Sequence, residues 1–445
     1  MNHRGPPNEP RDSATEMITH MEMHQLKRFI PDSFPSNSPG DFHSDQTVSI
    51  IGAGVMGRGI AAACVCAGIP VRISDANSSA AKEAVEQILN CRESRANQHP
   101  RLVDPTAAPL VSVAADDAEI ADADLIIEAV PENFALKTAI LSRIESHLRC
   151  ETVIASNSSS LSIAQLSAAL QAPGRFCGLH FCHPVSARPL VEVVYTDATT
   201  PETIRRATAF AATLRLAPIV IRDSPGFLLN RLLVPYLNES LELLLDGADI
   251  ETLDHAAVSF GMPHGPMASF DEFGIDVAIA VGRSLYRAFP ERIVPCELLI
   301  AMYKSGRLGR KSGGGFYQTQ GDARAGRLDP HVIDLIRERR RGENRLSEDV
   351  ITRRLFLPFL LEATRTLQES LVACPLVVDA VLRSGLGMNG SGSGIFAWAN
   401  SIGARTLVDW LQPLHALGKR FEPTSLLLDA AIRNISIGET DRTAA

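Results

Sequence analysis

The sequence lacks the features that mark membrane-spanning and nucleic-acid-binding proteins. Its apolar runs are short and are interrupted by charges or glycines, so none reaches the roughly 18 to 20 residues that a bilayer span requires. Basic residues are fewer than acidic ones: the chain has 43 Lys and Arg and 51 Asp and Glu, so its formal net charge is -8. No basic stripe is present to track a phosphate backbone. We therefore expect no membrane span and no nucleic-acid partner.

Cysteine pairs at metal-binding or redox spacing are also missing. The chain has 8 cysteines but no Cys-x-x-Cys motif. A chain of 445 residues buries enough apolar surface to fold without a disulfide framework. We therefore expect reduced thiols, a cytoplasmic location and no metal site.

The length of the chain, with 45% hydrophobic residues, favours several domains. Residues 1–45 are polar and proline-rich and lack the apolar core of a secretory signal, which predicts a disordered extension. The predicted divisions after it are an α/β domain at 46–223, a helical unit at 224–320, a charged linker at 321–347, a second helical unit at 348–437 and a tail at 438–445.

Short β-branched runs alternate with longer amphipathic runs between Thr47 and Asp223. This alternation is typical of a parallel sheet covered by helices. After Asp223 the strand pattern stops, and helices with glycine punctuation are predicted. The predicted strands are Thr47–Ile51, Val71–Asp75, Asp124–Val130, Thr152–Asn157, Arg175–Phe181, Leu190–Tyr195 and Pro218–Arg222.

The two helical units resemble each other in sequence. Arg231–Glu239 and Arg354–Glu362 match position by position and share an arginine, a proline and a glutamate at the same spacing. Asp271–Ile275 parallels Ala399–Gly403 more loosely. Chance similarity between two amphipathic helices is the alternative, but the three shared residues favour an internal duplication.

A glycine-rich turn follows the first predicted strand. Gly52, Gly54 and Gly57 form a Gly-x-Gly-x-x-Gly motif that encloses Val55 and Met56. The first glycine permits a tight turn, the second lets the backbone approach a pyrophosphate at a helix start, and the third allows close helix packing. We expect this turn to bind a dinucleotide.

Asp75 indicates which dinucleotide is preferred. It ends the second predicted strand, where its carboxylate can accept hydrogen bonds from ribose hydroxyls and would repel a 2′-phosphate. The next residue is Ala76 rather than an arginine, although Arg72 lies nearby. NAD is therefore favoured over NADP.

Glu132 and Lys137 follow the predicted strand Asp124–Val130, at the carboxyl edge of the sheet where α/β proteins bind ligands. The chain has only six lysines, so Lys137 is unexpected as a generic surface charge. We interpret the two residues as cofactor contacts near the nicotinamide. An ordinary charged pair at a helix start is the alternative.

His180 and Glu192 lie in two neighbouring apolar strands. A lone histidine is more often structural. A glutamate inside Leu-Val-Glu-Val-Val, however, is costly to bury without a partner. His180 is the natural partner, and the pair has the composition of a general base that removes a proton from a hydroxyl.

These segments together resemble the 3-hydroxyacyl-CoA dehydrogenase family, from about Thr47 to Asn434. The order and spacing of five polar residues match that family: Glu132, Ser159, His180, Glu192 and Asn230. The resemblance implies that His180 is the catalytic base and Glu192 its orienting partner. It also implies that Ser159 and Asn230 contact the acyl group near the reacting carbon.

The resemblance further implies a Rossmann-type NAD-binding domain followed by two all-α repeats. The implied reaction is oxidation of an L-3-hydroxyacyl thioester, on CoA or an acyl carrier protein, to the 3-ketoacyl thioester, as in fatty acid β-oxidation. Two repeats resemble the dehydrogenase half of multifunctional β-oxidation enzymes, without the enoyl-CoA hydratase half. One-repeat members pair two subunits through the helical domain, so we expect a monomer with an internal pseudo-dimer of repeats.

The loop after His180 departs from the family pattern. His183-Pro184 stands where Asn-Pro is usual, and Val185–Pro189 is more polar than the usual apolar loop. We interpret His183 as favouring a polar or short acyl group. A neutral replacement in a strand-capping loop is the alternative.

Two other functions are open on the sequence alone. A β-hydroxyacid dehydrogenase acting on a free acid shares the Gly-x-Met-Gly sequence seen here at Gly54–Gly57, but that class uses a lysine base where this chain offers Asn230. A non-catalytic dinucleotide-binding module is the other alternative, and the intact set of polar site residues argues against it.

Overall fold

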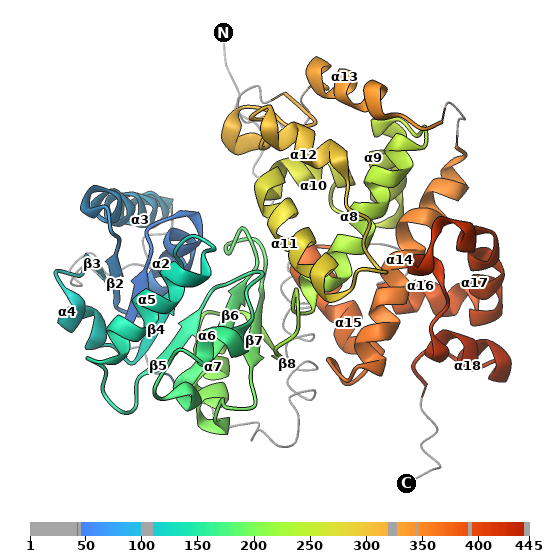
Figure 1. The fold of residues 1–445 in the computed structure, drawn as a ribbon. Coiled ribbons are helices and arrows are strands. Elements are labelled where there is room, and N and C mark those ends of the chain that lie inside the picture. Colours follow the sequence, from blue (N-terminus) through green and yellow to red (C-terminus); the bar gives the residue numbers. More distant parts are fainter. Residues whose placement is uncertain are drawn as a thin grey trace.

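The protein has an α/β lobe followed by an all-helical lobe (Figure 1). The predicted extension at 1–45 lies outside the described residues except for Phe42, which is buried against Phe210 with ring centroids 5.0 Å apart. The predicted tail lies outside them after Glu439. The computed structural model describes Phe42 and residues 46–98, 110–318, 327–342, 346–389 and 394–439.

One eight-stranded sheet forms the α/β lobe, in the order β3-β2-β1-β4-β5-β6-β7-β8. All residues of β1 and β4 are buried, as in a sheet with helices on both faces. The seven predicted strands all form, and β3 is an additional edge strand. The strands are β1 (Val48–Ile51), β2 (Val71–Ser74), β3 (Val111–Val113), β4 (Leu125–Glu128), β5 (Val153–Ser156), β6 (Phe176–Phe181), β7 (Leu190–Tyr195) and β8 (Ala217–Arg222).

The prediction of a parallel sheet is wrong at one position, because β7 runs antiparallel to β6. The loop at 182–189 that joins them is too short for the crossover of roughly a dozen or more residues that a parallel pair needs. β8 then pairs parallel with β7. This reversal sets His180 directly opposite Glu192 in the strand register.

Helices cover the sheet, and several begin at a side-chain cap. Asn133, Ser162 and Thr200 each accept a hydrogen bond from a backbone N–H in the first turn of the helix that follows. The helices of this lobe are α2 (Val55–Cys66), α3 (Ser78–Gln98), α4 (Asp117–Ala121), α5 (Phe134–Glu145), α6 (Ile163–Ser167) and α7 (Pro201–Thr213).

The second lobe consists of helices around α8 and α14, which pack against each other. Its apolar core is continuous with side chains of β7 and β8, while a second, separate core lies within the α/β lobe. No helix in the described ranges is both long and apolar enough to cross a membrane. The main helices are α8 (Leu229–Leu245), α9 (Ile250–Phe260), α10 (Pro266–Phe273), α11 (Ile275–Ala288), α12 (Glu297–Lys304), α13 (Pro330–Arg339), α14 (Glu348–Gln368), α15 (Pro375–Val381), α16 (Ile395–Ile402), α17 (Ala404–Leu411) and α18 (Ser425–Arg433), with a π-helical turn at Leu382–Leu386.

Reciprocal ion pairs join α8 to α14. Arg231 Nε on α8 donates to Glu362 Oε1 at 2.9 Å, and Arg354 Nε on α14 donates to Glu239 Oε1 at 2.6 Å. All four side chains are buried. Each helix also contains a proline, Pro235 in α8 and Pro358 in α14, at equivalent positions.

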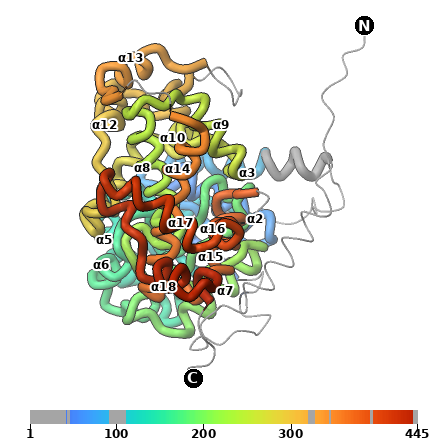
Figure 2. The backbone as a smooth tube through the Cα atoms, turned by 90° about the vertical axis from the view of Figure 1, so that its right-hand side faces the viewer, coloured from blue at the N-terminus to red at the C-terminus, as the bar shows by residue number. Residues whose placement is uncertain are grey.

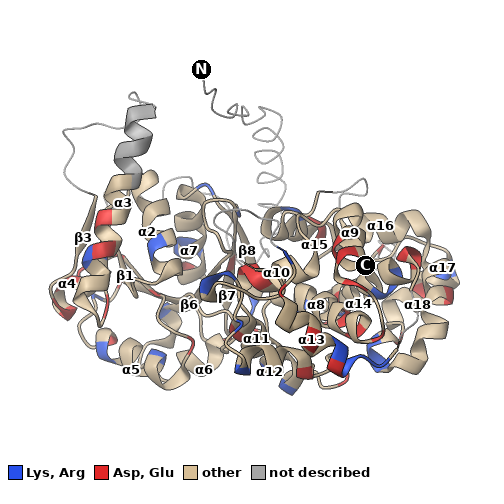
Figure 3. Cartoon of the chain, turned by 90° about the horizontal axis from the view of Figure 1, so that it is seen from above, with Lys and Arg blue, Asp and Glu red and all other residues tan. Residues whose placement is uncertain are grey.

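The segment predicted as a charged linker contains a helix, α13. Asp329 caps it, and α13 lies at the opposite end of the helical lobe from α18 (Figures 1 and 2). After α13 the chain returns to the end of α8, where Arg341 Nη2 donates to Glu242 Oε2 at 2.8 Å and lies 3.0 Å from Asp246 Oδ1. Among the described residues seen in Figure 3, basic side chains are interspersed with acidic ones.

Candidate active site

The glycine turn after β1 has the geometry that its motif predicts. Gly52 has φ +112°, and a Cβ on it would lie 2.5 Å from the carbonyl oxygen of Ala129. A Cβ on Gly57 would lie 1.9 Å from the carbonyl oxygen of Gly52, so α2 packs on the turn itself. Around Gly54, by contrast, nothing lies within 4 Å of a Cβ position. Of the three glycines in the motif, Gly54 alone faces open space, which leaves the start of α2 accessible to a ligand.

Asp75 lies beside the same turn. Its Oδ2 accepts a hydrogen bond from the Ala53 N–H at 2.8 Å, and its Oδ1 accepts from the Asn77 N–H at 2.9 Å. On α2, Val55 is 60% exposed and Met56 is half-buried. The structure therefore brings Asp75 next to the glycine turn, as the sequence predicts.

Lys137 is enclosed rather than exposed. Its side chain is 1% exposed, and Nζ donates to Glu128 Oε1 at 2.7 Å, to Glu128 Oε2 at 3.0 Å and to the Val130 carbonyl at 3.2 Å. Glu128 also accepts from Ser156 Oγ at 2.6 Å. The pair joins the ends of β4 and β5 to α5, and the prediction that Lys137 contacts a cofactor stays a prediction.

Glu132 organises the serine-rich turn after β5. Its Oε1 accepts from Ser158 Oγ at 2.6 Å and from the backbone N–H groups of Ser159 at 3.0 Å and Ser160 at 2.7 Å. Its other oxygen lies 3.4 Å from Lys137 Nζ. Burial raises the pKa of Glu132, but Lys137 and these hydrogen bonds lower it by more. The net pKa is therefore below the usual value. Glu132 is therefore an ionised carboxylate that fixes the position of Ser159.

His180 and Glu192 form a buried pair. His180 Nδ1 lies 2.5 Å from Glu192 Oε2, and the side chains are 10% and 0% exposed. The ring of Phe227 lies against the imidazole, with centroids 5.5 Å apart. A carboxylate at Nδ1 fixes the tautomer that leaves Nε2 without a proton.

Glu192 has a second contact that the sequence did not predict. Its Oε1 accepts from the backbone N–H groups of Leu228 and Leu229, both at 2.9 Å, at the start of α8. Unsatisfied N–H groups at a helix start are favourable partners for a carboxylate. One glutamate therefore ties β7 and His180 to the helix that carries Asn230.

Asn230 and Ser159 are also brought together. Asn230 Nδ2 donates to the Ser159 carbonyl at 2.9 Å. Because Asn230 follows Leu229 directly, the start of α8 connects the His180–Glu192 pair to the serine turn. Asn157 makes a further link that the sequence analysis missed, since its Oδ1 accepts from the Phe181 N–H at 3.1 Å.

His183 lies on the exposed part of the loop between β6 and β7. Partial burial lowers the pKa of His183, and Arg188 lowers it as well, while Glu272 on α10 raises it. The loop touches both lobes: Val185 Cγ2 would lie 3.3 Å from a Cβ on Gly59 of α2, and Arg188 lies over Gly387 of the second helical unit.

Among the residues that the structure describes, no group of three or more His, Cys, Asp or Glu side chains is arranged to hold a metal ion. The site therefore consists of a glycine turn, an imidazole–carboxylate pair and a serine–asparagine contact. β1, β4, β5 and β6 are parallel, so all of these groups lie at the same carboxyl edge of the sheet.

Comparison with known families agrees with this arrangement. Residues 47–224 match the model of the 3-hydroxyacyl-CoA dehydrogenase NAD binding domain, and residues 226–319 match the model of the C-terminal domain of that family. The fatty acid oxidation complex subunit alpha of Shewanella halifaxensis is 35% identical over 389 residues, which cover 86% of this chain and 54% of that protein. The chain thus spans about half the length of this curated relative.

Solved structures are similar over most or all of their length. The 3-hydroxybutyryl-CoA dehydrogenase of Escherichia coli K12 has a TM-score of 0.74 and 25% identity, covering 88% of this chain and 99% of that one. FadB2 of M. tuberculosis has a TM-score of 0.59 and 33% identity, covering 62% of this chain and 100% of that one.

Proposed function

Because the chain belongs to the 3-hydroxyacyl-CoA dehydrogenase family, we propose that it catalyses the NAD-dependent oxidation of an L-3-hydroxyacyl-CoA to the 3-ketoacyl-CoA, as in fatty acid β-oxidation. The observation that carries this proposal is the 2.5 Å contact between His180 Nδ1 and Glu192 Oε2, at the same sheet edge as the glycine turn. A base and a dinucleotide turn at one edge are what this oxidation needs.

The residues present fit NAD. The open space at Gly54 leaves room for a pyrophosphate at the start of α2, and Asp75 stands beside the turn where a ribose would lie. When bound, NAD supplies the two-electron acceptor for the oxidation of C3. The rest of the contact with the pyrophosphate would come from Gly52, Val55, Met56 and Gly57. Toward the nicotinamide end of NAD would lie Glu132 and Lys137.

His180 removes the proton of the C3 hydroxyl through Nε2. Glu192 accepts from Nδ1 and stabilises the imidazolium that forms, while the two N–H groups of α8 hold the carboxylate in place. Ser159 and Asn230 position the acyl group, because their mutual hydrogen bond fixes both next to this pair. We propose these four residues as the catalytic set.

The assay that tests the function is NADH formation with a panel of 3-hydroxyacyl-CoA chain lengths, beside the same acids unesterified and the matching acyl-carrier-protein thioesters. Turnover of the CoA thioesters alone is the expected result. Turnover of the free acids would favour a β-hydroxyacid dehydrogenase, and NAD binding without any turnover would favour a non-catalytic module.

Cofactor choice has its own test. Asp75→Ser combined with Ala76→Arg should weaken NAD and admit NADP, because the carboxylate is removed and a cation is offered to the 2′-phosphate. The ratio of kcat/KM for the two cofactors measures this. Equal use of both cofactors by the wild type would overturn the role of Asp75.

We further propose that residues 224–320 and 348–437 are two copies of one helical unit. Arg231, Glu239 and Asp246 recur at constant spacing as Arg354, Glu362 and Glu369, and each arginine pairs with the carboxylates of the other unit. Such reciprocal contacts are those of an isologous interface. The units also share a turn: Gly274 and Gly403, before α11 and α17, have φ 96° and 90°. The shared turn matches Gly274 with Gly403. The sequence comparison matches Gly274 with Ile402, so the two alignments differ by one residue.

An internal pseudo-dimer satisfies the helical interface within one molecule, so we propose a monomer in the cytoplasm with the domain limits given above. Sedimentation should give the mass of a single chain. Truncation near Gly321 should expose the face of α8 that packs on α14 and cause aggregation or dimerisation. A fully active, monomeric truncation would contradict the proposal.

A further inference from the structure

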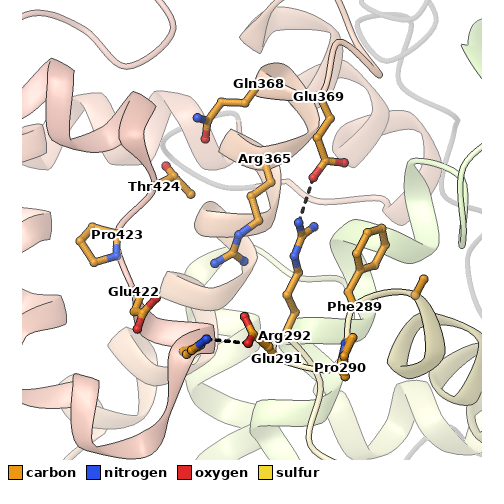
Figure 4. A pocket seen from close by; sticks show the side chains of 12 residues that line it. Phe289, Pro290, Glu291, Arg292, Arg365, Gln368, Glu369, Glu422, Pro423 and Thr424 are labelled. Carbon is orange, nitrogen blue, oxygen red and sulfur yellow. Dashed lines mark hydrogen bonds and ion pairs between the residues drawn. The ribbon is translucent and has the colours of Figure 1, made fainter.

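A cavity of about 630 Å³ lies in the helical lobe, outside the site described above (Figure 4). Its walls are the segment after α11 at 288–292, the last turn of α14 with Arg365 and Glu369, and the segment 419–424 before α18. The volume is within the roughly 300–1,000 Å³ range of small-molecule sites. Figure 4 shows the Arg365 side chain pointing into the middle of these walls.

Arginines outnumber carboxylates in the cluster behind this cavity. Glu362 accepts from Arg231, Arg292 and Arg365, and Glu369 accepts from Arg231 and Arg292. Arg365 is the least satisfied of the three. Among the described residues its guanidinium makes one hydrogen bond, from Nη1 to Glu362 Oε2 at 3.2 Å, although its side chain is only 15% exposed.

At the opposite end of the α8–α14 pair, the residue equivalent to Arg365 has a partner within the chain. The constant spacing that relates Arg231 to Arg354 also relates Glu242 to Arg365 and Asp246 to Glu369. At Glu242 the chain supplies a cation of its own, since Arg341 binds both Glu242 and Asp246. Arg365, at the position equivalent to Glu242, lines the cavity, and the sign of the charge there has changed from negative to positive.

We propose that this cavity binds a small organic anion, a carboxylate or phosphate ester, whose charged group pairs with the Arg365 guanidinium. Because the charge at Arg365 is opposite to that at Glu242, an occupant that pairs with it is opposite in sign to Arg341. A guanidinium presents several parallel N–H donors that match either anion in a bidentate manner. The cavity exceeds the size of a bare ion, so the anion belongs to a larger molecule.

The remaining charges in the walls leave this preference intact. Lys419 Nζ lies 2.5 Å from Glu291 Oε1, so these two charges are paired, and Glu369 is held by two arginines. Glu422 also lines the cavity and is exposed to solvent.

Protonation energetics agree with the contact pattern. Burial lowers the pKa of Arg365, and Arg292 and Arg231 lower it further, while Glu362 raises it; the net shift is downward. Burial also disfavours the charge of Arg341, yet Glu242 and Asp246 raise its pKa above the usual value. The pKa of Arg341 is thus raised above its usual value and that of Arg365 is lowered.

Titration calorimetry of the full chain with pyrophosphate and with citrate, carried out with NAD at saturation so that the glycine turn is occupied, tests the proposal without any acyl substrate. The wild type should bind at least one probe with an affinity that falls as salt rises. Arg365→Gln should weaken that binding about ten- to a hundredfold, the value of a charge-assisted hydrogen bond. Arg337→Gln removes the same charge from an exposed side chain on α13 and should leave binding unchanged.

Two further variants keep the test decisive if Arg365→Gln folds poorly. Arg365→Lys keeps the charge but loses the parallel N–H donors of the guanidinium, so it should bind the probe more weakly than the wild type. Arg365→Glu recreates the charge at Glu242, and should abolish anion binding and admit agmatine, a guanidinium-bearing probe. The proposal is overturned if neither anion binds the wild type, or if Arg365→Glu binds pyrophosphate and citrate as the wild type does.

Discussion

The two lobes both bury carboxylates but surround them with different partners. In the α/β lobe, Glu192 meets the imidazole of His180 and two backbone N–H groups. In the helical lobe, Glu362 meets the guanidinium groups of Arg231 and Arg292. Glu192 is 0% exposed and Glu362 is 2% exposed, so burial does not distinguish them.

The partner distinguishes the two carboxylates. An imidazole gains and loses a proton near neutral pH, whereas a guanidinium stays charged at any pH that a protein tolerates. Glu192 can therefore stabilise a charge that appears and disappears during turnover. Glu362 can only hold one arrangement of two helices. This contrast predicts that mutations in the first pair change rate, and that mutations in the second change stability.

The largest effect is expected from His180→Gln. It removes the proton acceptor, so kcat should fall roughly 10²- to 10⁴-fold, the contribution of general-base catalysis. The glutamine amide can still donate to Glu192, so the urea unfolding midpoint should stay close to that of the wild type. Stopped-flow NADH formation and urea unfolding measure the two quantities. Near-normal turnover would remove His180 from its role.

Glu362→Gln should have the opposite profile. It leaves Arg231, whose side chain is 1% exposed, with one less counter-charge, and breaking a buried pair costs roughly 3–5 kcal/mol. Chemical unfolding measures this loss. Glu338→Gln is the matched control, because Glu338 is exposed and pairs with Arg339 at the surface. A loss for Glu362→Gln no larger than that of the control would break the comparison.

Asp271 sharpens the comparison, because among the described residues this buried carboxylate accepts hydrogen bonds from the backbone N–H groups of Phe316 and Tyr317 and from no side chain. Burial raises the pKa of Asp271 to about 6, although these two hydrogen bonds oppose the shift. The folded protein therefore holds this proton more tightly than the unfolded chain. The stabilisation is fully present below about pH 4, the unfolded value, and is lost as pH rises through about 6.

Asp271→Asn should remove this pH dependence. The free energy of unfolding of the wild type, taken relative to the variant, should fall by about 2 kcal/mol as pH rises from about 4 to about 7. Urea unfolding at several pH values measures the difference. A constant difference across that range would show that Asp271 is ionised throughout.

Much of the fold follows from local patterns in the sequence. Buried runs such as Val48–Ile51 are recognisable because every residue in them is apolar or small. β3 was missed because it has three residues and lies at the sheet edge, where neither length nor burial marks it. The antiparallel β7 was missed although the short loop at 182–189 was a usable signal.

The site was less accessible to sequence reasoning where contacts are long-range. The glycine turn and the pairing of His180 with Glu192 could be expected, because each rests on a motif or on an unpaired buried charge. The hydrogen bonds from Leu228 and Leu229 to Glu192 could not, since they depend on where α8 begins relative to β7. The enclosure of Lys137 by Glu128 was missed because only Glu132 was considered as its partner.

The smallest effect is expected from His183→Asn. This variant tests whether the loop between the antiparallel strands β6 and β7 adds substrate selectivity to the His180–Glu192 pair. His183 is exposed three residues after His180, and its lowered pKa leaves a neutral, polar ring at pH 7. If this ring faces the acyl group, the variant should shift the ratio of kcat/KM toward 3-hydroxydecanoyl-CoA over 3-hydroxybutyryl-CoA by roughly tenfold or less, since pocket contacts of this size discriminate weakly. Ser186→Ala on the same loop is the control. An identical chain-length profile in all three proteins would mean that His183 only caps the strand.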